Sequence, residues 1–120
     1  MKISITINGK TLIATLEQTA AARAFAALLP MTLNLEDYNG TEKISTLAKR
    51  LDTKGAPEGY TPKTGDLAYY APWGNMCIFY RGFRYSPSLI RLGTIEGDLT
   101  LLQQPGDVSN VTFKLIEPGS

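Results

Sequence analysis

The sequence predicts a mainly β protein, a closed antiparallel barrel of about eight short strands capped by one or two short helices. Three observations lead to this fold class. Apolar and polar residues alternate in several short segments, as in strands with one buried face. Eleven glycines and seven prolines punctuate the 120 residues, as turns between many short strands require. Asn-Gly, a strong signal for a two-residue turn, follows two of the alternating segments.

The clearest local element is an opening hairpin. The three isoleucines of Lys2–Asn8 fall on one face of a strand. Asn8-Gly9 then supplies two residues that accept positive φ. Lys10–Leu16 returns as the second strand.

A short helix follows this hairpin. Apolar residues of Thr19–Leu29 recur with helical spacing, and alanine is the best helix former. Thr19 is suited to cap the start by accepting a backbone N–H bond, and Pro30 ends the helix. Because its apolar face is narrow, we expect the helix to cover one end of a sheet.

The rest of the chain continues as one domain, residues 1–120, because neither side of the long loop Asp52–Thr64 is large enough to fold alone. Glu42–Leu51 is ambiguous between a strand and a helical turn, and Gly97–Gln103 has room for one or two helical turns. Further strands are predicted at Met31–Asp37, Leu67–Ala71, Met76–Tyr80, Leu89–Ile95 and Val111–Glu117.

Charge argues against a nucleic-acid partner. The net charge is +1, whereas a protein held mainly by phosphates carries a large basic excess. The stretch RGFRYSPS departs from the RNA-recognition octapeptide at Arg84, Ser86 and Ser88. The first strand also lacks the aromatic residue that would stack a second base.

The sequence constrains the cellular location of the protein only weakly. No apolar run approaches the roughly 20 residues that span a bilayer, so we expect no membrane partner. The start alternates instead of forming the continuous apolar core of a signal peptide. We expect a cytoplasmic protein, although a leader removed from a longer chain would leave no trace. Oligomeric state is not readable from the sequence.

Residues suited to catalysis are scarce. The chain contains no histidine, which removes the Ser-His-Asp and Cys-His arrangements and the commonest metal ligand. Cys77 lies in an apolar run that favours an inert, buried thiol. Glu36 and Asp37 point to opposite faces of a strand. We therefore predict no catalytic residue, no metal site and no cofactor.

One cluster has the chemistry of a binding site. Tyrosine and tryptophan offer stacking area with a polar group, and arginine offers a planar fork for carboxylates or amides. One alternative is that these aromatic rings simply close the barrel end. The other concerns the three arginines of residues 67–95, a segment that has no acidic residue, which would then form a solvated face of the sheet. The predicted ligand-binding residues are Tyr70, Trp73, Asn75, Arg81, Tyr85 and Arg91.

Three stretches resemble the bacterial cyclophilin-like domains. They are AFAALLPMTLNLEDYNGTEK (residues 24–43), GDLAYYAPWGNMCIFYRGFRYS (residues 65–86) and LIRLGTIEGDLTLL (residues 89–102). With the opening hairpin and the closing strand, the likeness spans nearly the whole chain. The resemblance implies a closed barrel of about eight antiparallel strands with helices covering its two ends.

The resemblance does not extend to catalytic residues. In true cyclophilins, which isomerise X-Pro bonds, the catalytic arginine lies in a strand after the first helix, followed by a glutamine. The corresponding stretch here, Thr32–Asp37, has neither residue, and the histidine of their proline pocket is absent. By contrast, Leu92–Gly97 looks like the structural strand and turn that precede the second cyclophilin helix.

Three functions follow as hypotheses. The first is a non-catalytic barrel that binds a small molecule or an extended peptide. The alternative is a divergent peptidyl-prolyl isomerase, in which Arg81 or Arg84 would hydrogen-bond the prolyl nitrogen and lower a barrier of roughly 20 kcal/mol. The third is an interaction domain that uses a strand edge, which complete barrel closure would remove.

Overall fold

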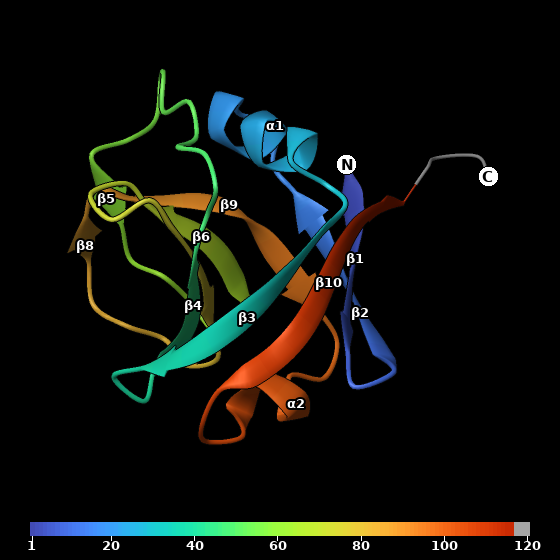
Figure 1. Cartoon of the computed structure of the whole chain (residues 1–120). Coiled ribbons are helices and arrows are strands. Elements are labelled where there is room, and N and C mark those ends of the chain that lie inside the picture. Colours follow the sequence, from blue (N-terminus) through green and yellow to red (C-terminus); the bar gives the residue numbers. More distant parts are fainter. Residues whose placement is uncertain (117–120) are drawn as a thin grey trace.

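The computed structural model describes residues 1–116, and in these the chain forms a closed antiparallel barrel (Figure 1). The barrel order is β1-β10-β3-β4-β7-β6-β9-β2, which confirms the predicted fold class. Its strands are β1 (Lys2–Ile7), β2 (Lys10–Leu16), β3 (Met31–Tyr38), β4 (Glu42–Thr46), β6 (Asp66–Tyr70), β7 (Asn75–Phe79), β9 (Leu89–Glu96) and β10 (Val108–Ile116). The other elements are a separate sheet of β5 (Gly59–Tyr60) and β8 (Ser86–Pro87), and the helices α1 (Ala20–Ala27) and α2 (Thr100–Gln103).

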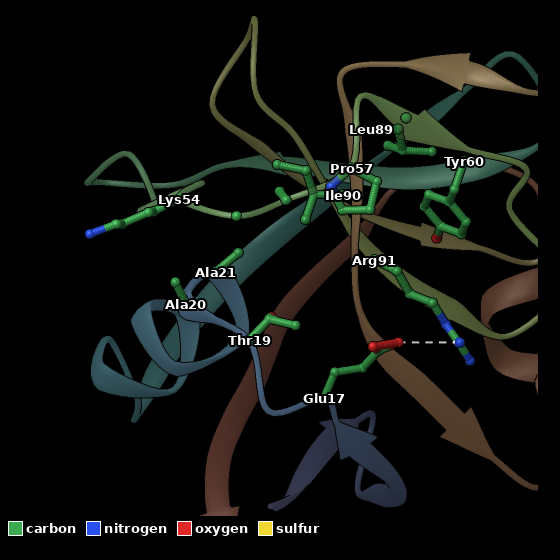
Figure 2. Close-up of a pocket in the computed structure, with 13 residues that line it drawn as sticks. Glu17, Thr19, Ala20, Ala21, Lys54, Pro57, Tyr60, Leu89, Ile90 and Arg91 are labelled. Carbon is green, nitrogen blue, oxygen red and sulfur yellow. Dashed lines mark ion pairs between the residues drawn. The ribbon is translucent and has the colours of Figure 1, made fainter.

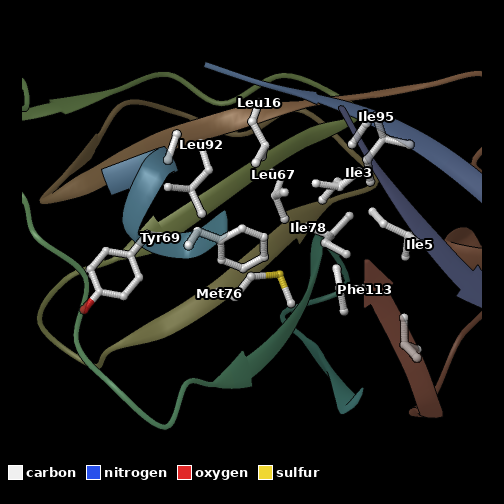
Figure 3. Close-up of a cluster of buried hydrophobic side chains, with 14 of the residues drawn as sticks. Ile3, Ile5, Leu16, Leu67, Tyr69, Met76, Ile78, Leu92, Ile95 and Phe113 are labelled. Atoms are coloured by element: carbon white, nitrogen blue, oxygen red, sulfur yellow. The ribbon is translucent and has the colours of Figure 1, made fainter. Parts of the chain in front are cut away.

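The barrel interior holds the main core. Alternate residues of each strand point inward, so the isoleucines of β1 are fully buried. Leu67, Ile78 and Phe113 converge on the same interior (Figure 3). Phe25 of α1 meets Phe113 edge-to-face at 6.1 Å between ring centroids, which fixes α1 over one end of the barrel.

The opening hairpin and the first helix form as predicted. Ile7 pairs with Lys10, and Asn8 and Gly9 take positive φ values of 49° and 79°. The amide of Ala22 donates to Thr19 Oγ1 at 3.1 Å and so caps α1. α1 and α2 lie at opposite ends of the barrel (Figure 1).

Several boundaries differ from the sequence prediction. The ambiguous segment Glu42–Leu51 begins as strand β4 and leaves regular structure after Thr46. The predicted loop Asp52–Thr64 contains β5, which is too short to produce an alternating pattern. The last strand begins at Val108, earlier than predicted, and its expected end at Glu117 lies outside the described residues.

Strand β7 is buried on both faces. Met76 and Ile78 point into the barrel, whereas Cys77 and Phe79 join a second apolar cluster on the outside. Residues 80–88 cover that cluster and are tied down by backbone hydrogen bonds, including one from Ser88 N to Glu58 O at 2.6 Å. This covering segment shapes the outer surface on which the candidate site lies.

A lysine lies inside the barrel. Lys43 of β4 pairs with Ile78 and has no exposed side-chain surface. Its Nζ donates to Asp37 Oδ1 at 3.0 Å and to the carbonyl of Gln104 at 2.7 Å. The hydroxyl of Tyr80 donates to the same Asp37 oxygen at 2.6 Å. The buried charge is therefore paired, as burial requires, and it ties β3 and β4 to the segment that precedes β10.

The close contact between β2 and β9 generates the first prediction. A Cβ added to Gly93 would lie 2.2 Å from Thr15 O and 3.0 Å from Leu16 Cα, and both are backbone atoms. We expect Gly93→Ala to lower the free energy of unfolding in urea by about 2 kcal/mol. Gly82→Ala is the control, because its nearest atom is 3.8 Å away. Equal stability of the two variants would contradict the close contact.

The Lys43 network generates the second prediction. The hydrogen bond from Tyr80 and the ammonium of Lys43 hold the pKa of Asp37 below its usual value of 3.8, although burial opposes them. The ionised Asp37 therefore stabilises the folded state fully above pH 3.8, the ordinary pKa of the group. This stabilisation is lost as the pH falls through the lower pKa that Asp37 has in the folded protein. We expect Asp37→Asn to be less stable at neutral pH and to show a flatter decline in unfolding free energy below pH 3.8.

The control for this measurement is Glu36→Gln, which removes an exposed acid from the same strand. It should keep the acid-dependent decline of the unaltered protein. Parallel pH curves for Asp37→Asn and the unaltered protein would show that the Asp37 network does not contribute to acid unfolding.

Candidate functional site

Two cavities of ligand size border the small β5–β8 sheet. One, of about 340 Å³, lies over the outer face of β4, β7 and β6, under the covering segment. We call it the aromatic cavity, because its lining includes the rings of Tyr38, Tyr70, Trp73, Phe79, Phe83 and Tyr85. The other, of about 410 Å³, lies between the start of α1, residues 54–57 and β9, and is called the second cavity.

The floor of the aromatic cavity is the outer face of β4 and β7. Ile44 pairs with Cys77 in the strand register, and both line the cavity. Asn75 is buried, and its Oδ1 accepts a hydrogen bond from Thr46 Oγ1 at 3.0 Å. The floor is therefore largely apolar with one fixed amide.

The rim of the aromatic cavity consists of exposed rings. The exposed fractions are 42% for Tyr38, 51% for Trp73 and 53% for Tyr85. Trp73 lies in the tight β6–β7 turn, where its amide donates to Tyr70 O at 3.3 Å. The Trp73 ring meets Tyr38 edge-on at 5.7 Å and Tyr70 at 5.3 Å. These contacts hold the indole in place although half of it is exposed.

Two charged side chains line the aromatic cavity. Glu42 is half-buried on β4, and burial raises the pKa of its carboxyl, while the nearby Cys77 thiol lowers it by a smaller amount. Arg84 is exposed, and its guanidinium carbon lies 5.2 Å from the centre of the Phe83 ring. The cavity thus carries one charge of each sign.

Cys77 is the one thiol of the chain and is buried. Burial, and then the neighbouring Glu42, raise the pKa of the thiol above its ordinary value. A protonated thiol is a poor nucleophile.

The structure brings together four of the six residues predicted for a site. Tyr70, Trp73, Asn75 and Tyr85 line the aromatic cavity. Arg81 lies outside its lining, and Arg91 lines the second cavity.

Three lining residues with polar or aromatic chemistry, Tyr38, Glu42 and Arg84, were not among the six predicted ligand-binding residues. Arg84 was visible in the arginine-containing stretch beside Tyr85, but nothing in the sequence distinguished it from Arg81. Tyr38 and Glu42 flank the predicted Asn39-Gly40 turn. They reach the cavity because β4 pairs with β7, a contact between distant parts of the chain.

Arg91 is the charge of the second cavity that is neutralised by carboxylates, whereas Lys54 lines the same cavity and forms none of the ion pairs found in residues 1–116 (Figure 2). Arg91 Nη1 lies 3.2 Å from Glu17 Oε1, and its Nε lies 3.5 Å from Asp66 Oδ1. The Tyr60 hydroxyl is buried and has no hydrogen-bond partner among the described residues. Burial, with Asp66 adding to it, raises the pKa of Tyr60, so this hydroxyl stays protonated.

Neither a metal cluster nor a membrane-spanning helix is found in residues 1–116. No group of three His, Cys, Asp or Glu side chains within that range is placed to hold a metal ion. No helix of the same range is long and apolar enough to cross a membrane.

The fold and the site define a small closed-barrel domain with a ligand-sized cavity on its outer face. Residues 5–114 match the cyclophilin-like family, and the chain belongs to that family. This confirms the resemblance found in the sequence.

A solved structure supports the same fold. The solution structure of a hypothetical protein from Archaeoglobus fulgidus is similar, with a TM-score of 0.65 and 18% sequence identity. The similarity covers 95% of this chain and 93% of the archaeal chain. A comparison with curated proteins found no significant match.

Proposed function

We propose that the aromatic cavity binds a small molecule or an extended peptide without catalysing a reaction. One observation carries the proposal. The described residues include six exposed large hydrophobic side chains, and three of them, Tyr38, Trp73 and Tyr85, line this one cavity. Exposed apolar residues that gather at one hollow mark an interaction site, whereas scattered ones need no explanation.

The dimensions and chemistry of the cavity support a ligand site. Its volume of about 340 Å³ falls in the roughly 300–1,000 Å³ range of small-molecule pockets. The apolar floor supplies buried area, and the aromatic rim supplies stacking surfaces with polar hydroxyl and indole groups. Asn75 adds a fixed amide, which suits recognition of a peptide group.

The floor offers little for covalent or acid–base chemistry. The raised pKa of Cys77 keeps the thiol protonated, and the charged group that acts on it is the carboxylate of Glu42, which disfavours a thiolate. The chain has no histidine to act as a base. Both points support binding over catalysis.

The alternative function is peptidyl-prolyl isomerisation, and one observation favours it. Arg84 lines the aromatic cavity, so its guanidinium is available to donate a hydrogen bond to a prolyl nitrogen and weaken the amide resonance. The binding proposal predicts that a protease-coupled assay with proline peptides gives the uncatalysed rate. Acceleration that disappears in Arg84→Gln would establish the isomerase instead.

The proposed site has an internal reporter, because Trp73 is the single tryptophan of the chain. We expect members of a set of aromatic fragments and short proline peptides to change its fluorescence. Tyr85→Ala should weaken their binding about tenfold, because one aromatic contact is lost. Leu115→Ala is the control, since it truncates an exposed apolar residue that does not line the cavity.

Backbone NMR shifts of the floor residues provide a second readout if a ligand leaves the fluorescence unchanged. Ligands that bind Tyr85→Ala and the unaltered protein equally would place binding outside the aromatic cavity. No binding by any fragment or peptide would remove the proposed function.

A further inference from the structure

We propose that the ligand of the aromatic cavity is a small zwitterion with an aromatic group, such as an aromatic amino acid or a short peptide containing one. Its ammonium group meets Glu42, its carboxylate meets Arg84, and its ring lies against Trp73 and Tyr85. This inference rests on the proposed function of the same cavity and adds the chemical class of the ligand.

The first argument is that neither charge of the aromatic cavity has an ion-pair partner in the part of the chain that the structure describes. The ion pairs among residues 1–116 are Lys2–Glu96, Lys43–Asp37, Arg91–Glu17 and Arg91–Asp66. Glu42 and Arg84 take part in none of these, although both line one cavity. In the second cavity, Arg91 is neutralised by two protein carboxylates, and Lys54 is the lining charge that takes part in none of the four pairs, so the aromatic cavity is the one with unpaired charges of both signs.

The position of Glu42 favours a cation from outside the chain. Its carboxyl is half-buried over a floor that includes Ile44 and Phe79, and the polar side chain beside it is the neutral Cys77 thiol, a weak hydrogen-bond donor. Burial is the largest cause of the raised pKa of Glu42, and the Cys77 thiol offsets only part of it, so the carboxylate has lost water without gaining a cation among the described residues. An ammonium group would restore the lost interaction.

Arg84 is suited to the opposite end of such a ligand. Its guanidinium packs near the ring of Phe83, which restricts the motion of an otherwise exposed side chain. A restricted guanidinium presents a planar fork that matches the two oxygens of a carboxylate. A ligand with one charge would neutralise only one of the two residues.

Binding of four forms of phenylalanine tests this inference on the unaltered protein. Phenylalanine carries both charges, phenylalaninamide only the positive one, N-acetylphenylalanine only the negative one, and N-acetylphenylalaninamide neither. We expect phenylalanine to bind about tenfold more tightly than either singly charged form, and the neutral form to bind most weakly. Trp73 fluorescence and backbone NMR shifts provide the affinities.

The dipeptide phenylalanylglycine is measured in parallel, because its two charges are farther apart than those of phenylalanine. Tighter binding by the dipeptide would assign the ligand as a short peptide, and tighter binding by phenylalanine would assign it as an amino acid. Either order supports a zwitterion.

Two variants assign each charge to its residue. Glu42→Gln should bind phenylalanine and N-acetylphenylalanine equally, because the ammonium has lost its partner. Arg84→Gln should bind phenylalanine and phenylalaninamide equally. The matched controls are Glu36→Gln and Arg81→Gln, which remove exposed charges outside the cavity lining and should keep the preferences of the unaltered protein.

The outcomes separate this inference from the proposed function. Equal binding of all four forms at the aromatic cavity would overturn the zwitterion and leave the binding function in place. Tightest binding by a singly charged form would also overturn it. If neither these compounds nor any fragment or peptide binds, both the inference and the proposed function are wrong.

Discussion

The two-sided burial of strand β7 is the constraint on which the candidate site depends. The inner residues of β7 complete the barrel core, and its outer residues are also apolar. An apolar outer face must be covered, and residues 80–88 provide the cover through their hydrogen bonds to residues 58–62. Because the cover does not fill the space above β4 and β7, it leaves the aromatic cavity. The cavity is therefore a consequence of how the barrel wall is packed from outside.

The sequence predicted well what depends on local pattern. Alternation identified the long strands, Asn-Gly identified the hairpin turn, and Thr19 identified the helix cap. Strand β4 resisted this reasoning for a physical reason. Its apolar Ile44 faces outward, while Lys43 faces the interior and is neutralised there by Asp37. Because the ion pair allows a charged residue to face the interior and an apolar residue to face outward, the alternation of polar and apolar residues does not predict which face of β4 is buried.

Where the predicted site residues lie depends on the same difference between local and long-range contacts. Tyr70, Trp73 and Asn75 come together because one tight turn connects their strands, which the sequence makes visible. The arginines were harder to place, since their neighbours are set by strand order. Arg91 lies on β9 and forms ion pairs with Glu17, which follows β2, and with Asp66 of β6. It therefore lines the second cavity. Glu42 enters the aromatic cavity only because β4 and β7 are adjacent in the closed barrel.

Two barrels of the same fold with few identical residues have a physical explanation. The barrel is specified by inward-facing residues, strand register and turns, all of which can be satisfied by many sequences. The archaeal structure shows this directly, because it shares the fold across nearly the whole chain at 18% identity. Residues on the outer wall contribute less to closure and are free to vary, so a shared barrel does not determine what its surface binds. For this chain the proposed ligand therefore rests on the cavity residues themselves, and foremost on Glu42 and Arg84, which form no ion pair within residues 1–116.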